Sequence, residues 1–206
     1  MASFARDERS ALVQLLRETG PDAATLCTGW TTFDLAAHLV TRERQPLAGP
    51  GLLITRLHPL TAALERRAQR RGYDTLLDQI DAGPPRWTPA AWSPRLDSAM
   101  NLAEFFVHHE DVRRLREQTP RRLPEGESDA LARTARTVAR LIARRARARL
   151  TLAPAGRETR TVGRGQREAT VHGEVGEIVL WLFGRHSAAQ VSVDGDAAKL
   201  VEEATL

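Results

Sequence analysis

The spacing of hydrophobic and polar residues changes near residue 150. Before that point, apolar residues recur three and four positions apart, which is the period of one face of an amphipathic helix. In residues 3–19, for example, Phe4, Leu12 and Leu16 fall near one face. The same pattern predicts further helices over residues 32–44, 56–71, 73–81, 96–117 and 128–148. A Pro-rich stretch at 84–95 predicts a long loop instead.

Beyond residue 150 the pattern becomes that of short strands punctuated by Gly and Pro. Thr and Val alternate with polar residues in RLTLAP, ETRTVG, EATVHG and QVSVDG. A short apolar helix is predicted over residues 174–184, and a last helix over DAAKLVEEA. The residues through which the first of these helices should pack are Ile178, Leu180, Trp181 and Leu182. We therefore predict a mainly α protein, with a four-helix bundle in residues 1–148 and a small α+β unit in residues 149–206.

Two of the predicted helices carry polar groups among apolar residues. In FDLAAHLV (33–40), Asp34 and His38 are four residues apart and therefore share a helix face. In NLAEFFVHHEDV (101–112), Glu104 and His108 have the same spacing, and their neighbours are apolar almost all round the helix. A carboxylate buried there is costly unless it is paired or binds a metal.

These residues indicate a metal site between facing helices. Glu104 and His108 would supply an oxygen and a nitrogen, and His38 would supply a third ligand from a second helix. Catalytic zinc commonly takes three ligands from the protein, and helical bundles build metal sites in this way. The alternative is that each pair lies on a solvated helix face. We expect the adjacent His109 and Glu110 to face solvent or to support the site.

The charge of the chain raises a rival hypothesis, nucleic-acid binding. The net charge is +4, the isoelectric point is about 10.4, and Lys199 is the single lysine among 30 basic residues. Within residues 131–150, five arginines fall along one helix face: Arg133, Arg136, Arg140, Arg144 and Arg147. An amphipathic helix that packs its apolar side on the protein explains the same pattern. Nucleic-acid binding is therefore the less favoured alternative.

No segment indicates a membrane or secreted protein. The apolar stretch at residues 178–183 is far shorter than the roughly 18 residues that a membrane-spanning helix needs. The N-terminal segment MASFARDERS lacks the apolar core of a signal peptide. Cys27 is the only cysteine, so no internal disulfide can form. We expect a cytoplasmic protein, and the sequence does not set its oligomeric state.

Three motifs resemble one protein family, in the same order and over nearly the whole chain. They are LCTGWTTFDLAAHLVTRE (26–43), NLAEFFVHHEDVRR (101–114) and GEVGEIVLWLFGR (173–185), the last followed by VSVDGD (191–196). The first resembles the start of the mycothiol-dependent maleylpyruvate isomerase family, within the DinB-like group of metal-binding four-helix bundles. The second is similar to the Glu-x-x-x-His helix of that family, and the third to its small C-terminal domain.

The resemblance implies a metal centre and roles for two further residues. The ligands would be His38, Glu104 and His108, and the divalent metal would be zinc, although the same donors suit nickel and iron(II). Asp34 would sit at the mouth of the site to orient a ligand, bind a thiol cofactor or accept a proton; alternatively, it stabilises its helix N-terminus. Arg185 would reach over the metal to hold a carboxylate or a thiol cofactor, or would stabilise a helix C-terminus.

The implied activity is that of a metal-dependent, thiol-using isomerase or S-transferase. Such a site activates a low-molecular-weight thiol, mycothiol in this family, for isomerisation of an electrophilic substrate or for transfer onto it. Cys27 is not needed as the nucleophile and is expected to be a buried structural cysteine. The alternatives are metal binding without catalysis and, less favoured, nucleic-acid binding through the arginine-rich helix.

Overall fold

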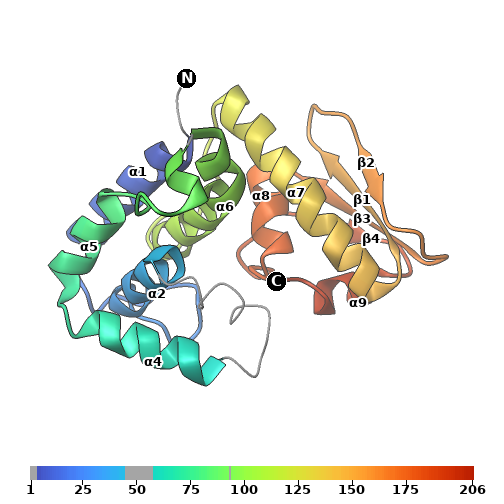
Figure 1. The fold of residues 1–206 in the computed structure, drawn as a ribbon. Helices are drawn as coiled ribbons and strands as arrows, with labels where there is room; N and C mark the ends of the chain where they lie inside the picture. Colours follow the sequence, from blue (N-terminus) through green and yellow to red (C-terminus); the bar gives the residue numbers. More distant parts are fainter. Residues whose placement is uncertain (1–3, 45–57, 93) are drawn as a thin grey trace. The chain divides into compact units, whose positions relative to one another are not determined.

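The chain folds into two compact units, residues 1–117 and residues 118–206. The computed structural model describes residues 4–44, 58–92 and 94–206. The N-terminal unit is built from helices (Figure 1). They are α1 (Phe4–Thr19), α2 (Thr32–Arg44), α4 (His58–Gln69), α5 (Tyr73–Asp81) and α6 (Pro94–Arg113), with a 3₁₀ turn at Pro89–Trp92.

The core of the N-terminal unit forms where the apolar faces of these helices meet. α1 packs along α6, and α2 packs on α4 and α5. Fully buried residues from four of the helices fill the space between them: Leu12, Leu16, Leu35, Leu39, Leu76, Leu77 and Phe105. One buried charge pair crosses this core, because Arg9 of α1 donates to Glu43 of α2 over 2.6 Å. The same guanidinium lies 4.4 Å over the ring of Phe105 on α6, so it links three helices.

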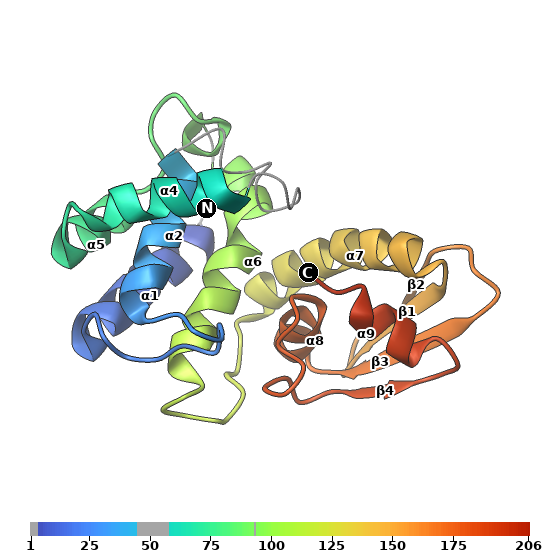
Figure 2. The same ribbon diagram turned by 90° about the horizontal axis from the view of Figure 1, so that it is seen from below.

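The C-terminal unit places three helices on one face of a four-stranded sheet (Figure 2). Its elements are α7 (Glu125–Ala146), β1 (Arg149–Pro154), β2 (Arg160–Val162), β3 (Glu168–Gly173), α8 (Val175–Leu182), β4 (Ser192–Asp194) and α9 (Ala198–Glu203). The strand order is β2-β1-β3-β4. The central pair, β1 and β3, is parallel, and each outer strand is antiparallel to its neighbour.

Alternation along the strands decides which face of the sheet the helices cover. Leu150 pairs with Ala169, and Leu152 pairs with Val171, and all four side chains are buried. Thr151 lies between the two leucines, and its hydroxyl meets that of Thr161 on β2 at 2.8 Å. The apolar residues therefore line one face, against α7, α8 and α9. The predicted packing residues of α8 are all buried: Ile178, Leu180, Trp181 and Leu182.

The predicted fold class is confirmed, since the protein is mainly α with a helical bundle followed by a small α+β unit. The division of the chain nevertheless differs from the expected boundary at residue 148, because α7 belongs to the C-terminal unit. Its apolar face, which includes Leu131, Ala135 and Ile142, packs on α8, α9 and the sheet. None of the described helices is long and apolar enough to cross a membrane.

Candidate metal centre

The start of α2 is fixed by a reciprocal cap that uses Asp34. The Asp34 carboxylate accepts the Thr31 amide at 2.8 Å and the Thr31 hydroxyl at 2.7 Å, and the Asp34 amide donates back to that hydroxyl. Its other oxygen accepts the Gln69 amide at 2.8 Å. Partial burial works to raise the pKa of Asp34, but the bonds from Thr31 and Gln69 prevail and hold that pKa below its ordinary value. Both oxygens of Asp34 thus have partners within the protein.

A tight turn at residues 27–30 places two side chains beside the candidate site. The Trp30 amide donates to the Cys27 carbonyl over 2.9 Å, and Gly29 adopts a φ of +81°, which favours glycine. The turn holds the Trp30 ring 5.0 Å from the ring of His38. It also brings the Cys27 thiol to 3.2 Å from the carboxylate of Asp111. The first and last residues of the Cys-x-Gly-Trp motif therefore both contact residues at the candidate site.

One face of α6 carries a row of polar residues spaced three and four apart: Asn101, Glu104, His108 and Asp111. His38 approaches this row from α2. Its Nε2 lies 3.4 Å from Oε1 of Glu104, and Nε2 of His108 lies 3.3 Å from the same oxygen. One ligand atom from each of the three residues lies within 4.8 Å of the other two. The structure therefore brings together the three predicted metal ligands.

The opposite nitrogen of each imidazole faces a second carboxylate. Nδ1 of His38 lies 3.1 Å from Glu65 on α4, and Nδ1 of His108 lies 2.8 Å from Asp111. An ionised carboxylate can only accept hydrogen bonds, so each Nδ1 carries the proton in these contacts. When either ring is neutral, this arrangement leaves the lone pair on Nε2, on the side of Glu104. This is the way in which metal-binding histidines are usually oriented.

The ring of charges around Glu104 keeps it ionised. Burial works to raise the pKa of Glu104, but the nearby Arg42 and the two histidines outweigh burial and hold that pKa well below its ordinary value. Arg42 Nε lies 3.1 Å from Oε1 of Glu104, and its Nη1 donates to Asn101 over 2.8 Å. Glu104 is thus an anion that already attracts three nitrogen groups.

Neighbouring side chains shift the pKa of His108. Burial works to lower its pKa, but the bonds to Asp111, Cys27 and Glu104 prevail and hold the pKa of His108 well above its ordinary value. The metal-free site therefore favours the imidazolium form of His108. A metal ion must displace that proton to bind Nε2.

A second grouping of possible ligands overlaps with the first, since Cys27, His108 and Asp111 also lie within 4.8 Å of one another. The side chain of Asp111 is completely buried, so this grouping has no evident open position for a substrate. This arrangement is better suited to holding His108 in position than to forming a separate metal centre. Cys27 is half-buried, close to the expectation of a structural cysteine, but it contacts the carboxylate that holds His108.

Arg185 lies in the C-terminal unit, just beyond α8. Gly184 takes a φ of +79°, and the Arg185 amide donates to the Leu180 carbonyl at 3.0 Å, which is the bond of a Schellman cap. The Arg185 guanidinium donates to the Phe183 carbonyl. These contacts fit the helix-end alternative. A role for Arg185 at the metal site stays a prediction.

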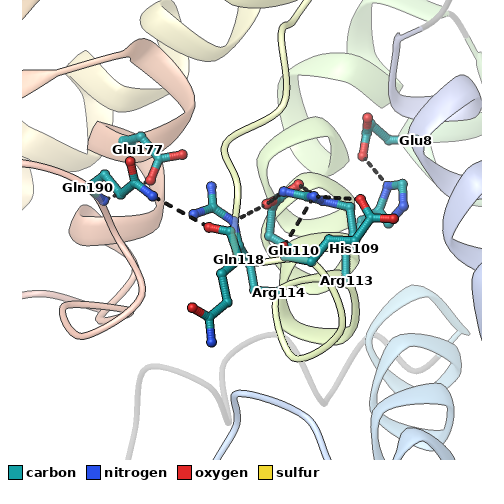
Figure 3. Close-up of polar contacts among 9 residues, drawn as sticks. Glu8, His109, Glu110, Arg113, Arg114, Gln118, Glu177 and Gln190 are labelled. Atoms are coloured by element: carbon teal, nitrogen blue, oxygen red, sulfur yellow. Dashed lines mark hydrogen bonds and ion pairs between the residues drawn. The ribbon is translucent and has the colours of Figure 1, made fainter.

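The other side of α6 corrects one expectation. His109 and Glu110 do not face solvent, because both are buried. Figure 3 shows the polar contacts that each makes with neighbouring side chains. Nδ1 of His109 lies 2.9 Å from Glu8 of α1. Glu110 accepts Arg113 at 2.8 Å and Arg114 at 2.6 Å. The apolar neighbours in the sequence indicated burial on this side, but they did not indicate the ionic partners.

Sequence reasoning also missed three residues that touch the proposed ligands. Asp111 had a readable signal, since it follows His108 by three positions on the same helix. Arg42 likewise follows His38 by four positions. Glu65 had no such signal, because it comes from α4 and reaches His38 only through the packing of α2 on α4.

Comparison with known proteins identifies the fold. No family model matches the sequence, and no curated protein matches it significantly. Among solved structures, the chain is similar to the crystal structure of the mycothiol-dependent maleylpyruvate isomerase, with a TM-score of 0.55 and 19% sequence identity. The match covers 95% of this chain and 91% of the isomerase chain. The resemblance that the motifs indicated is therefore confirmed at the level of the fold.

Proposed function

We propose that this protein binds one divalent metal ion through His38, Glu104 and His108 and uses the site to activate a low-molecular-weight thiol. The reaction would be isomerisation of an electrophilic substrate or transfer of the thiol sulfur onto it. The similarity in fold to a mycothiol-dependent isomerase supports this class of chemistry and makes mycothiol the first thiol to test.

One observation carries the proposal. Two imidazoles from different helices each have Nδ1 against a carboxylate, and both direct Nε2 toward one oxygen of Glu104 at 3.3 and 3.4 Å. Histidines held only for packing have no reason to converge in this way. Two nitrogens and one carboxylate oxygen fit a divalent ion that keeps an open position, and zinc is our first choice. Nickel and iron(II) suit the same donors.

The residues around the ligands would hold the site in one geometry. Glu65 and Asp111 orient the two rings, and the ring of Trp30 packs at the side of His38. A divalent ion held there would lower the pKa of a bound thiol toward neutrality. Arg42 would leave Glu104 when the ion binds and would then offer a cation to an anionic substrate group.

The thiol chemistry needs no nucleophile from the chain. A thiolate adds through sulfur to the electrophilic carbon of an activated double bond, and a proton is taken up at the neighbouring carbon. For isomerisation, rotation about the new single bond is followed by loss of that proton and departure of the thiolate. For S-transfer, the carbon–sulfur bond remains. A free thiol co-substrate and a Cys27 side chain outside any disulfide both suit a reducing compartment, so we propose a cytoplasmic location.

Asp34 and Arg185, the other two predicted site residues, have different proposed roles. Asp34 acts as the cap of α2, because Thr31 and Gln69 occupy its oxygens. Arg185 is proposed to hold a carboxylate of the substrate or thiol. Replacing Arg185 with Ala should then weaken ligand binding while metal content stays unchanged, and Arg185→Lys should restore only part of it.

Elemental analysis of the purified protein tests the metal site directly. We expect close to one divalent ion per chain, with most of it lost in His38→Ala and His108→Ala and reduced occupancy in Glu104→Gln. His172→Ala is the matched control, because His172 is an exposed histidine of β3 outside the site. Absence of metal from the wild-type protein after zinc loading would refute the proposal.

A thermal-shift series then tests the thiol. The zinc-loaded protein is heated with mycothiol, bacillithiol or glutathione, and the same series is repeated with His108→Ala. Stabilisation by one thiol that disappears in the variant supports thiol activation. Equal and negligible shifts with all three thiols in a protein that does hold metal would leave metal binding without catalysis as the function.

A further inference from the structure

A cavity of about 290 Å³ lies in the C-terminal unit, whereas the proposed metal ligands belong to the N-terminal unit. All the residues that line it belong to this unit. They come from the first half of α7, from the end of β1 and the turn into β2, and from the start of α8. Figure 1 shows α7 running alongside β1 and β2. The volume is at the lower end of the range for small-molecule sites.

The floor of this cavity is apolar. It is formed by four buried side chains from α7, β1 and α8: Ala135, Leu152, Val175 and Ile178. Pro154 and Ala132 add further apolar surface at its wall. Such a floor favours the hydrocarbon part of a ligand, because contact with it removes apolar area from water.

The rim of the cavity is basic. Four arginines line it, against two carboxylates. The carboxylates are already used, since Asp129 pairs with Arg157 and Glu158 pairs with Arg160. Arg133 and Arg136 lie one turn apart on α7, and neither has an ion-pair partner among the residues that the structure describes. Two cations are therefore available on the same wall.

We propose that this cavity binds a small organic anion. The apolar body of the ligand lies on Leu152 and Ile178, and its carboxylate or phosphate group lies between Arg133 and Arg136. Guanidinium groups suit both anions, because their planar donors can make paired hydrogen bonds. A concave apolar floor below two cations is a better match to such a molecule than to an inorganic ion, which would leave the floor exposed.

The same geometry argues against nucleic acid as the occupant. A nucleic-acid backbone needs a track of cations along an accessible surface. Here Asp129 and Glu158 pair with two of the four arginines, which leaves two cations on the rim and no track of them. Duplex DNA is therefore a control in the test.

The test uses NMR titration of the ¹⁵N-labelled full chain with phenyl phosphate, benzoate and inorganic phosphate. Phenyl phosphate and benzoate share the proposed chemistry and differ in the anion, whereas inorganic phosphate lacks the apolar body. We expect saturable shifts at residues 129–136, 152–160 and 175–178 with one or both aromatic anions. Inorganic phosphate should bind at least about tenfold more weakly, since it gains nothing from the apolar floor.

Two arginine variants locate the binding. Arg136→Gln should weaken the aromatic anion about tenfold, the loss expected for one charge-assisted hydrogen bond. Arg140→Gln is the matched control, one turn further along α7 and outside the cavity. Equal loss in both variants, shifts outside the three segments, or tighter binding of duplex DNA than of either aromatic anion would overturn the proposal. Chelation of metal should leave the result unchanged, which separates it from the proposed thiol chemistry.

Discussion

Helix α6 buries charged residues on two faces, and the two sets are paired in different ways. On one face, the fully buried Glu110 accepts Arg113 and Arg114 at 2.8 and 2.6 Å, while His109 contacts Glu8. On the other, His38 and His108 are each held from behind by a carboxylate and turn Nε2 toward Glu104.

The difference separates structural charges from a candidate site. In the Glu110 set, Arg113 and Arg114 both donate to Oε2 of the carboxylate, and guanidinium nitrogens have no lone pair to offer a metal ion. In the Glu104 set, two nitrogen atoms and one oxygen meet within 4.8 Å. Burial of charge and convergence on one carboxylate oxygen are common to both sets, and only the second brings together atoms that can all bind a metal ion.

The largest expected effect is on stability, when the Glu110 set loses its central carboxylate. Glu110→Gln removes the buried anion that Arg113 and Arg114 share, and the free energy of unfolding should fall by about 3–5 kcal/mol. Urea denaturation measures the change. Glu117→Gln is the control, because Glu117 also contacts Arg113 but is exposed, and its loss should change stability by less than about 1 kcal/mol. Equal stability of the two variants would show that the Glu110 set does not behave as a buried ion network.

The next largest effect is on zinc affinity, when the Glu104 set loses a carboxylate that supports one of its histidines. Asp111→Asn should lower zinc affinity about 10- to 100-fold, because the ring of His108 loses the carboxylate that orients it. Competition with a fluorescent chelator measures the affinity. Glu65→Gln should have a smaller effect, since Glu65 is more exposed and its contact with His38 is longer.

A surface acid serves as the control for these two variants. Asp78 is exposed and pairs with Arg17 in the same unit, so Asp78→Asn should leave zinc affinity unchanged. If Asp111→Asn and Asp78→Asn bind zinc equally well, Asp111 does not position the ligand.

Zinc affinity of the Glu104 set should also depend on pH. The pKa of His108 is raised in the metal-free site, so the proton competes with zinc until the pH exceeds that raised value. Below it, the apparent affinity should rise about tenfold per pH unit for one displaced proton. Asp111→Asn removes a cause of the raised pKa, so the affinity should level off at a lower pH. A pH-independent affinity around and above the ordinary pKa of histidine would contradict this.

The smallest effect concerns the cap of α2. Asp34→Ala should lower the free energy of unfolding by about 1 kcal/mol and leave metal content unchanged. Because the pKa of Asp34 is depressed in the folded protein, this contribution is present above the ordinary pKa and is lost as the pH falls through the lowered one. Unchanged stability together with lost thiol binding would instead support the catalytic role first considered for Asp34.

Much of the local structure could be predicted because it depends on residues close together in the chain. The apolar periods predicted α1 and α5 to within a residue of their ends. The pairing of Glu104 with His108 follows from a four-residue spacing on one helix. These features persist in any packing of the helices.

Other features required the tertiary structure. Hydrophobic burial has no direction, so the apolar face of α7 was compatible with packing on either unit, and it packs on α8 and the sheet. The contact of His109 with Glu8 joins residues 101 positions apart. The contact of Glu65 with His38 depends on how α4 lies against α2.

The amino-acid sequence was therefore sufficient for the types of element, for the mainly α architecture and for the choice of His38, Glu104 and His108 as candidate ligands. Each of these follows from periodicity or from motifs along the chain. The three-dimensional packing decided which carboxylate contacts Nδ1 of each imidazole and which buried charges form ion pairs. It did so because hydrogen bonds and ion pairs act over a few ångströms and depend on angle, and packing alone sets those distances between separate helices.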